Sequence, residues 1–167
     1  MGLQHQASSP SARLAELGLT LPPVAAPVAA YVPAVRVGDL VYSSGQLPTV
    51  AGQLVATGKV GAEVSAETAA ECARTAVLNG LAAVSEQAGG IDEIERVVRV
   101  VIFVASAPDF TGQPQVGNGA SNVVGEIFGE AGRHARSAVG VSVLPLDAPV
   151  EVEVVVQVRR RPSIQPA

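Results

Sequence analysis

The stretch Val150-Glu151-Val152-Glu153-Val154-Val155-Val156-Gln157-Val158 decides the fold. Valine occupies every second position from residue 150 to residue 158, and Glu151, Glu153, Val155 and Gln157 alternate with it. Because successive side chains of a strand point to opposite faces of a sheet, the five valines share one face and need a cover. The opposite face carries the two carboxylates, and we expect Arg36 beside them.

Two helices are expected to supply the cover. Apolar residues recur at three- and four-residue steps over residues 64–88, where Ser65 suits the N-cap and Gly89-Gly90 ends the periodic pattern. A second helix, weakened by its glycines, is expected over residues 115–129.

The remaining strands give the order of elements. Residues 35–44 read as a hairpin that turns at Gly38-Asp39, residues 96–104 as a strand buried on both faces, and residues 138–143 as another strand. The order strand, strand, helix, strand, helix, strand, strand predicts an α+β fold with the helices on one face of the sheet. Loop 144–149 alone would favour a hairpin between the last two strands.

The length of 167 residues fits one compact domain. We expect a flexible tail over residues 1–10, a short helix and a proline-rich extension over residues 11–33, one domain over residues 34–160 and a second tail over residues 161–167. Ser11 is the expected cap of the short helix, and Gly18 its stop. The polar N-terminus, the lack of a long apolar run and a single cysteine predict a cytoplasmic protein without a membrane span.

Charge and composition exclude several classes of function. The formal net charge is -4, the pI is about 5.1 and only 3% of residues are aromatic, which disfavours nucleic acid as a partner. The two histidines, His5 and His134, have no partners at ligand spacing, so no metal is expected. Nothing else in the sequence supports a Ser-His-Asp triad built on His134.

Arg136 is the first residue that suggests a binding site. It precedes a strand whose residues on the same face, Ala138, Gly140 and Ser142, are small and leave space beside a guanidinium. The planar fork of arginine donors suits a carboxylate ligand. The alternative is a salt bridge with a nearby glutamate.

Glu151 and Glu153 are the candidate acid–base groups. A partly buried carboxyl on this face of the strand would have a raised pKa and could move protons. The alternative, favoured for Glu153, is pairing with arginines in an oligomer interface.

Three motifs carry a resemblance to a known family. Ser44-Gly45-Gln46-Leu47-Pro48, the strand start at Arg136-Ser137 and Val150-Glu151-Val152 together resemble the RidA/YjgF family, also labelled endoribonuclease L-PSP, over residues 31–158. The resemblance implies the chorismate mutase-like fold, in which the final strand is inserted between earlier ones. Residues 118–121 and 128–136 resemble a longer branch of this family.

The resemblance also implies a function. Family members form homotrimers with ligand sites between subunits and hydrolyse reactive enamines and imines to 2-oxo acids and ammonia, without a metal or cofactor. Carried over, Arg136 would clamp the substrate carboxylate and Glu151 would position or activate water. Tyr31 and Ser44 would line the pocket, and the backbone N–H of Ala138 would meet the carboxylate.

Departures from the family pattern leave a second interpretation open. Ala138 replaces a frequent cysteine, and His134 stands where proline often precedes Ala-Arg. A non-catalytic trimer that binds a small carboxylate metabolite, with a regulatory or protective role, is therefore the alternative to a 2-imino acid deaminase. RNA cleavage is disfavoured by the acidic pI.

Overall fold

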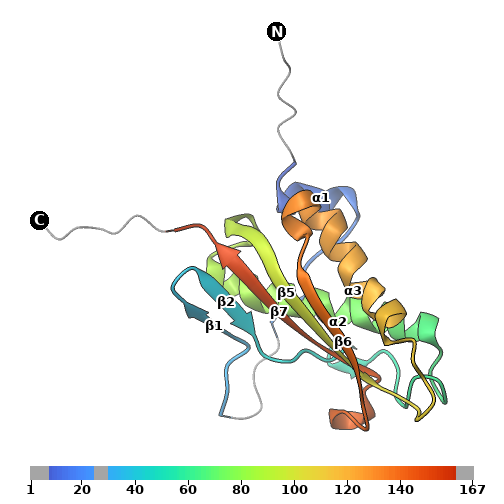
Figure 1. The fold of residues 1–167 in the computed structure, drawn as a ribbon. Helices are drawn as coiled ribbons and strands as arrows, with labels where there is room; N and C mark the ends of the chain where they lie inside the picture. The colour runs from blue at the N-terminus through green and yellow to red at the C-terminus, as the bar shows by residue number, and fades with distance from the viewer. Residues whose placement is uncertain (1–7, 25–29, 161–167) are drawn as a thin grey trace, which may run out of the picture.

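A five-stranded mixed sheet forms the centre of this computed structural model, which describes residues 8–24 and 30–160 (Figure 1). In this sheet β5 (Ile94–Ala105) pairs with β6 (Ala135–Val141) in parallel, and the other pairs of neighbouring strands are antiparallel. A separate two-stranded ribbon joins β3 (Thr49–Val50) to β4 (Gln53–Leu54). In spatial order the sheet consists of β1 (Ala34–Val37), β2 (Leu40–Ser43), β7 (Val150–Val158), β5 (Ile94–Ala105) and β6 (Ala135–Val141).

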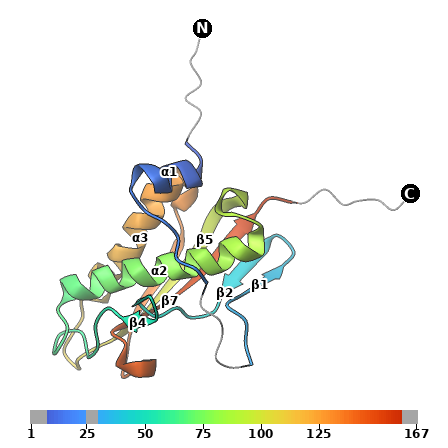
Figure 2. The same ribbon diagram turned by 180° about the vertical axis from the view of Figure 1, so that it is seen from behind.

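Two helices, α2 (Ala66–Ala88) and α3 (Gln113–Phe128), cover one face of the sheet, as Figure 2 shows from behind. The Ser65 side chain accepts a hydrogen bond of 3.1 Å from the Thr68 N–H at the start of α2, and Gly89 ends this helix with φ at 94°. Both boundary predictions for α2 are confirmed. The expected α+β architecture with two helices on one face is confirmed as well.

The alternating valines of β7 form the centre of the core. All five, at positions 150, 152, 154, 156 and 158, are no more than 1% exposed. The strand lies between β2 and β5, so the final strand is inserted between earlier ones and does not form a hairpin with β6. The position of β7 therefore agrees with the fold that the resemblance implied, and not with the hairpin that loop 144–149 favoured.

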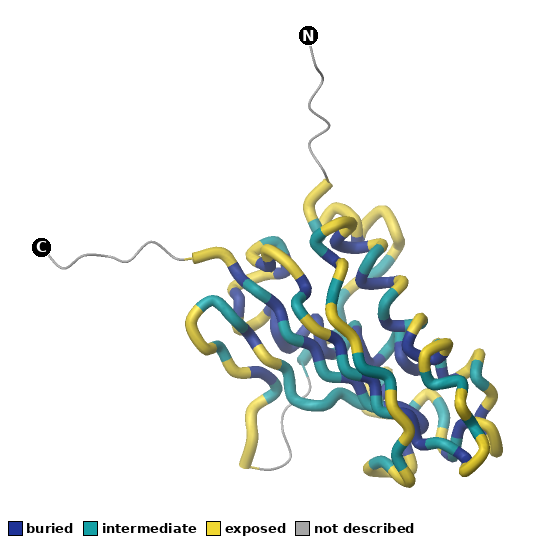
Figure 3. Tube along the Cα trace, viewed as in Figure 1, coloured by how far each residue is buried: buried dark blue, intermediate teal, exposed yellow. Residues whose placement is uncertain are grey.

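Two sheet predictions were wrong. The strand β5 is buried on one face only, because Val98, Val101 and Phe103 on its other side are half-buried in the chain. Figure 3 shows buried and less buried residues alternating along the strands of the sheet. Arg36 pairs in register with Val41, a fully buried residue of β2, so it lies on the helix side of the sheet and not beside the carboxylates. The carboxylate-bearing side of the sheet, called the open face here, is covered by no helix of the described chain (Figures 1 and 2).

A third, short helix α1 (Pro10–Glu16) packs against α3. Its cap is Ser9 and not Ser11, because the Ser9 side chain accepts the Ala12 N–H. Ser11 instead donates two hydrogen bonds to Asp92, from its N–H at 2.9 Å and from its hydroxyl at 2.6 Å. These contacts attach the N-terminal helix to the domain.

Several expected segments lie partly or wholly outside the described residues. These are positions 1–7 of the N-terminal tail, 25–29 of the proline-rich extension and the 161–167 tail. The expected helix at 115–129 begins two residues earlier, and the expected strand at 138–143 begins at Ala135 and ends at Val141. No helix within residues 8–24 and 30–160 is long and apolar enough to cross a membrane.

Candidate functional site

Arg136 lies on β6, which is the edge strand of the sheet. It pairs in register with Val100, a buried residue of β5 on the helix side, so its side chain points toward α3. One guanidinium nitrogen, Nη1, donates to Asn118 Oδ1 at 2.9 Å and to Ser121 Oγ at 3.2 Å. Ala138 follows on the same face of β6 and is half-buried.

His134 continues this hydrogen-bonded cluster. Its Nδ1 lies 2.6 Å from the carbonyl oxygen of Gly132, and its Nε2 lies 3.0 Å from Ser121 Oγ. A carbonyl oxygen only accepts hydrogen bonds, so the contact with Gly132 assigns a proton to Nδ1. In the neutral imidazole, Nε2 is then the acceptor for the Ser121 hydroxyl.

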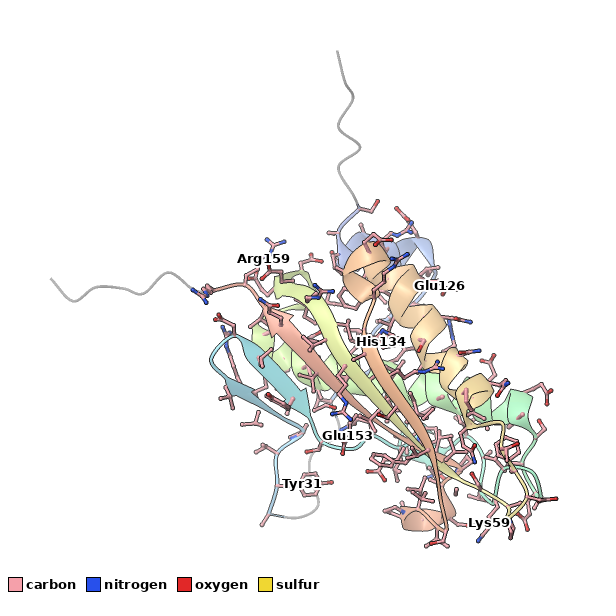
Figure 4. All side chains as sticks on the ribbon, viewed as in Figure 1. Tyr31, Lys59, Glu126, His134, Glu153 and Arg159 are labelled. Atoms are coloured by element: carbon pink, nitrogen blue, oxygen red, sulfur yellow. The ribbon has the colours of Figure 1, made fainter. Side chains whose placement is uncertain are left out.

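A shallow cavity of about 350 Å³, wide open to solvent, lies beside this cluster, between α3 and the start of β6 where Figure 4 labels His134. Its size falls in the range of small-ligand sites. Two charged side chains, a histidine, a serine and several glycines line it: Arg133, Arg136, His134, Ser121, Gly125, Gly129 and Gly132.

No carboxylate neutralises Arg136 within the described part of the chain. The ion pairs there join Arg13 to Glu16, Arg133 to Glu130 and Arg160 to Asp39. The alternative of a salt bridge between Arg136 and a nearby glutamate is therefore not realised among these residues. Arg136, with Asn118, Ser121, His134 and Ala138, is called the arginine half-site below.

Glu151 lies on the open face, opposite the helices. It pairs in register with Phe103 of β5, and Gly45 packs directly against its carboxyl group. A Cβ at position 45 would overlap the Glu151 carboxyl oxygen in this rotamer, so Gly45 lets the carboxyl group lie against the backbone. Burial, and then the charge of Glu153, raise the pKa of Glu151, which brings its carboxyl closer to a proton-transfer role near neutral pH.

Ser44 and Tyr31 belong to the same region as Glu151. The Ser44 hydroxyl donates to the Val32 carbonyl oxygen at 2.6 Å, and the Ser44 N–H donates to the Pro33 carbonyl oxygen at 2.8 Å. These bonds hold the segment that carries the exposed Tyr31 beside Ser44 and Gly45. Tyr31, Ser44 and Glu151 are called the glutamate half-site below.

The single chain does not bring the two half-sites together. Arg136 points to the helix side of the sheet and Glu151 to its open face. Figure 4 shows Tyr31 on the segment that leads into β1, and His134 at the start of β6, at opposite edges of the sheet. One site that uses both half-sites therefore needs two copies of the chain.

Sequence reasoning missed the contact of Ser121 and His134 with Arg136. His134 is two residues before Arg136, and this spacing places both side chains on one face of an extended segment. The sequence could therefore have predicted that His134 lies beside Arg136. Ser121 comes from another element, and no spacing in the sequence predicts its contact. Glu126 on α3 is exposed. No cluster of three metal-ligating side chains occurs in residues 8–24 and 30–160.

Comparisons with known proteins agree with this fold. Residues 11–158 match the family model described as "YjgF/chorismate_mutase-like, putative endoribonuclease". Protein TCP17 of Trypanosoma cruzi is 42% identical over 150 residues, which cover 88% of this chain and 92% of that protein. The 2-iminobutanoate/2-iminopropanoate deaminase of Dermatophagoides farinae is 35% identical over 131 residues, covering 78% and 87% of the two chains.

A solved structure is similar over most of its length. The protein Atu1372 of Agrobacterium tumefaciens, whose function is described as unknown, is 44% identical with a TM-score of 0.82. The match covers 88% of this chain and 91% of that one.

Proposed function

The chain belongs to the RidA/YjgF family with the chorismate mutase-like fold, and from this premise we propose that it hydrolyses reactive enamine and imine metabolites. The substrates are 2-iminopropanoate-like acids, and the products are 2-oxo acids and ammonia. The deaminase of Dermatophagoides farinae, which acts on compounds of this class by its name, supports the proposal.

The observation that carries the proposal is the position of Arg136 in the cavity. Asn118 and Ser121 hold one of its nitrogens, and no carboxylate of the described chain pairs with it. A guanidinium held in this way suits the carboxylate of a 2-imino acid. The backbone N–H of Ala138, on the same face of β6, is proposed as a second donor to this carboxylate.

We propose a homotrimer in which the arginine half-site of one subunit meets the glutamate half-site of its neighbour. The open face supports association, because it exposes 50% of Val35, 63% of Val37 and 40% of Tyr42. The strand β6 adds a sheet edge without a partner strand in the described chain.

The proposed chemistry needs little beyond positioning. The imine carbon is electrophilic, and Arg136 holds it in position by binding the substrate carboxylate next to it. Glu151 of the adjacent subunit accepts a proton from the attacking water, a role that its raised pKa favours. Tyr31 and Ser44 line the same side of the pocket. No metal or cofactor is part of this proposal.

The second candidate is a trimer that binds a small carboxylate metabolite without turnover. The departures from the family pattern at Ala138 and His134 favour it, because both residues lie close to Arg136. Tight binding of a 2-oxo acid without consumption of any imine would support this candidate, and rapid turnover would eliminate it.

The test is direct measurement of imine hydrolysis. A lyase generates 2-aminoacrylate in the cuvette, and imine loss is followed without protein, with the chain and with its Arg136→Ala variant. A charged hydrogen bond contributes about 1.5–3 kcal/mol, so the variant is expected to lose roughly 10- to 150-fold of the acceleration. Unchanged activity of the variant would refute the assigned role of Arg136.

A further inference from the structure

We propose that Ser121 and His134 form a proton-donating pair that protonates the nitrogen of the ligand whose carboxylate Arg136 holds. This inference rests on the proposed deaminase function and adds two residues to it. It starts from a continuous chain of hydrogen bonds through the arginine half-site. The chain runs from the Gly132 carbonyl oxygen through His134 to Ser121 Oγ, and on to Arg136.

The number of hydrogen bonds available to Ser121 determines where its proton points. A serine hydroxyl has one proton and two acceptor lone pairs. When His134 is protonated, its Nε2–H and the Arg136 Nη1–H both donate to Ser121 Oγ, over 3.0 Å and 3.2 Å. Both lone pairs are then occupied, and the hydroxyl proton is left for a group in the cavity.

Loss of the proton from His134 reverses this arrangement. The Gly132 carbonyl oxygen keeps the remaining proton on Nδ1, so Nε2 becomes an acceptor and takes the hydrogen bond of the Ser121 hydroxyl. Ser121 then offers the cavity a lone pair and no proton. The charge of His134 therefore controls whether this site can donate a proton.

The cavity places a ligand within reach of this pair. Ser121, His134 and Arg136 line the same space of about 350 Å³. A 2-imino acid carries its nitrogen on the carbon next to its carboxylate, so we place the nitrogen of a ligand anchored on Arg136 on the side of Ser121. Glu151 cannot take this role from the same chain, because it lies on the other face of the sheet.

With this pair, every proton that moves in the reaction has a donor and an acceptor. Water adds to the iminium carbon, a C–O bond forms, and the water gives one proton to Glu151 of the neighbouring subunit. In the resulting carbinolamine the C–N bond breaks and its electron pair stays on nitrogen. The leaving nitrogen takes the hydroxyl proton of Ser121, and Ser121 takes the proton of His134 Nε2 in its place. Ammonia then leaves. The hydroxyl proton of the carbinolamine passes to solvent as the carbonyl group forms. His134 then regains a proton from solvent, and Glu151 loses its proton to solvent.

Several charged groups on neighbouring elements surround His134. Arg136 lies two residues further along the chain, on β6. Arg133 lines the cavity and pairs with Glu130 at 3.4 Å, and the Arg96 side chain of β5 donates to the Arg133 carbonyl oxygen at 3.4 Å. Glu126 on α3 is exposed. A bound carboxylate would add a negative charge beside this mainly positive group.

The first test follows the imidazole of His134 by NMR during titration with pyruvate, a 2-oxo acid. The chain has two histidines, and loss of one set of signals in His134→Gln assigns the other to His5. We expect saturable movement of the His134 signals, which weakens at least twofold in Ser121→Ala. Pyruvate binding that leaves these signals in place, or no binding at all, would overturn the proposal.

The second test measures imine loss between about pH 6 and pH 9 with His134→Gln, Ser121→Ala and the control Asn122→Ala, an exposed neighbour on α3. General acid catalysis contributes about 10²- to 10⁴-fold. We therefore expect the first two variants to lose at least about 100-fold near pH 6.5. We also expect the rates of these two variants to depend less on pH than the wild-type rate does.

The outcomes separate this inference from the deaminase proposal. An active wild type with fully active His134→Gln and Ser121→Ala refutes the proton-donating pair and leaves the deaminase intact. A wild type that moves the His134 signals with pyruvate but consumes no imine refutes both the deaminase and the proton step.

Discussion

Replacing Gly119 by alanine is expected to separate the two long helices. A Cβ at position 119 would lie 2.6 Å from the Ala70 carbonyl carbon and 3.0 Å from its Cα, which are backbone atoms of α2 that cannot rotate away. Overpacking costs about 1–3 kcal/mol, and a clash between two helix backbones falls at the upper end. Alanine in a helix returns about 1 kcal/mol of intrinsic propensity. The net expectation for Gly119→Ala is a loss of about 2 kcal/mol.

Gly125→Ala is the matched control for this prediction. It lies in the same helix, but a Cβ there meets no atom within 4 Å. It therefore keeps the gain in propensity and is expected to stabilise the protein by about 1 kcal/mol, which raises Tm by roughly 2–4 °C at this chain length. Both variants are melted by circular dichroism at equal protein concentration, because association contributes to stability. Equal shifts in Tm for the two variants would refute the assigned contact between α2 and α3.

Three further predictions concern Glu151, Cys72 and Ser65. Burial, and then the charge of Glu153, raise the pKa of Glu151, so its ionised form destabilises the folded state above that pKa. Glu151→Gln should therefore have a higher Tm than wild type near pH 8. The two proteins should have equal Tm near pH 3.5, which is below the ordinary glutamate pKa of about 4.3. A difference that persists at the acidic pH would contradict this origin. Burial raises the pKa of the Cys72 thiol to about 11, so a thiol reagent should label Cys72 only after unfolding in guanidinium. Rapid labelling of the native protein would contradict the buried position of Cys72. Ser65→Ala should lower the free energy of unfolding by about 1 kcal/mol in urea titration through loss of the α2 cap, and an unchanged value would remove that role.

The sequence predicted the parts of the fold that depend on local pattern. The alternation in residues 150–158 and the helical periodicity of residues 64–88 each fix which side chains are buried, and the structure confirms both. The strand over residues 94–105 shows the limit of this reasoning. Nine of its twelve residues are apolar, and this composition led to the prediction of burial on both faces, whereas one face stays half-buried in the chain. That distinction depends on which elements cover the sheet.

The candidate site was predictable only in part. The small residues after Arg136 predicted space on their side of it, but the cavity lies on the other side, beside His134 and Arg133, and α3 packs close to Ala138 through Gly117. The sequence did not reveal that Arg136 and Glu151 point to opposite faces, because this depends on the register that joins β6 through β5 to β7. Nor did it reveal that Ser121 of α3 contacts Arg136, because a contact between a helix and a strand depends on their packing.

The measurement that tests the shared site most directly combines two inactive variants in one oligomer. Arg136→Ala and Glu151→Gln chains carrying different affinity tags are co-expressed, and oligomers that contain both are purified over two columns. If each site joins Arg136 of one subunit to Glu151 of its neighbour, a mixed trimer holds one intact site. We therefore predict about one third of the wild-type rate of imine loss, well above the residual rate of either parent alone. Mixed oligomers as inactive as the parents would contradict a site shared between subunits.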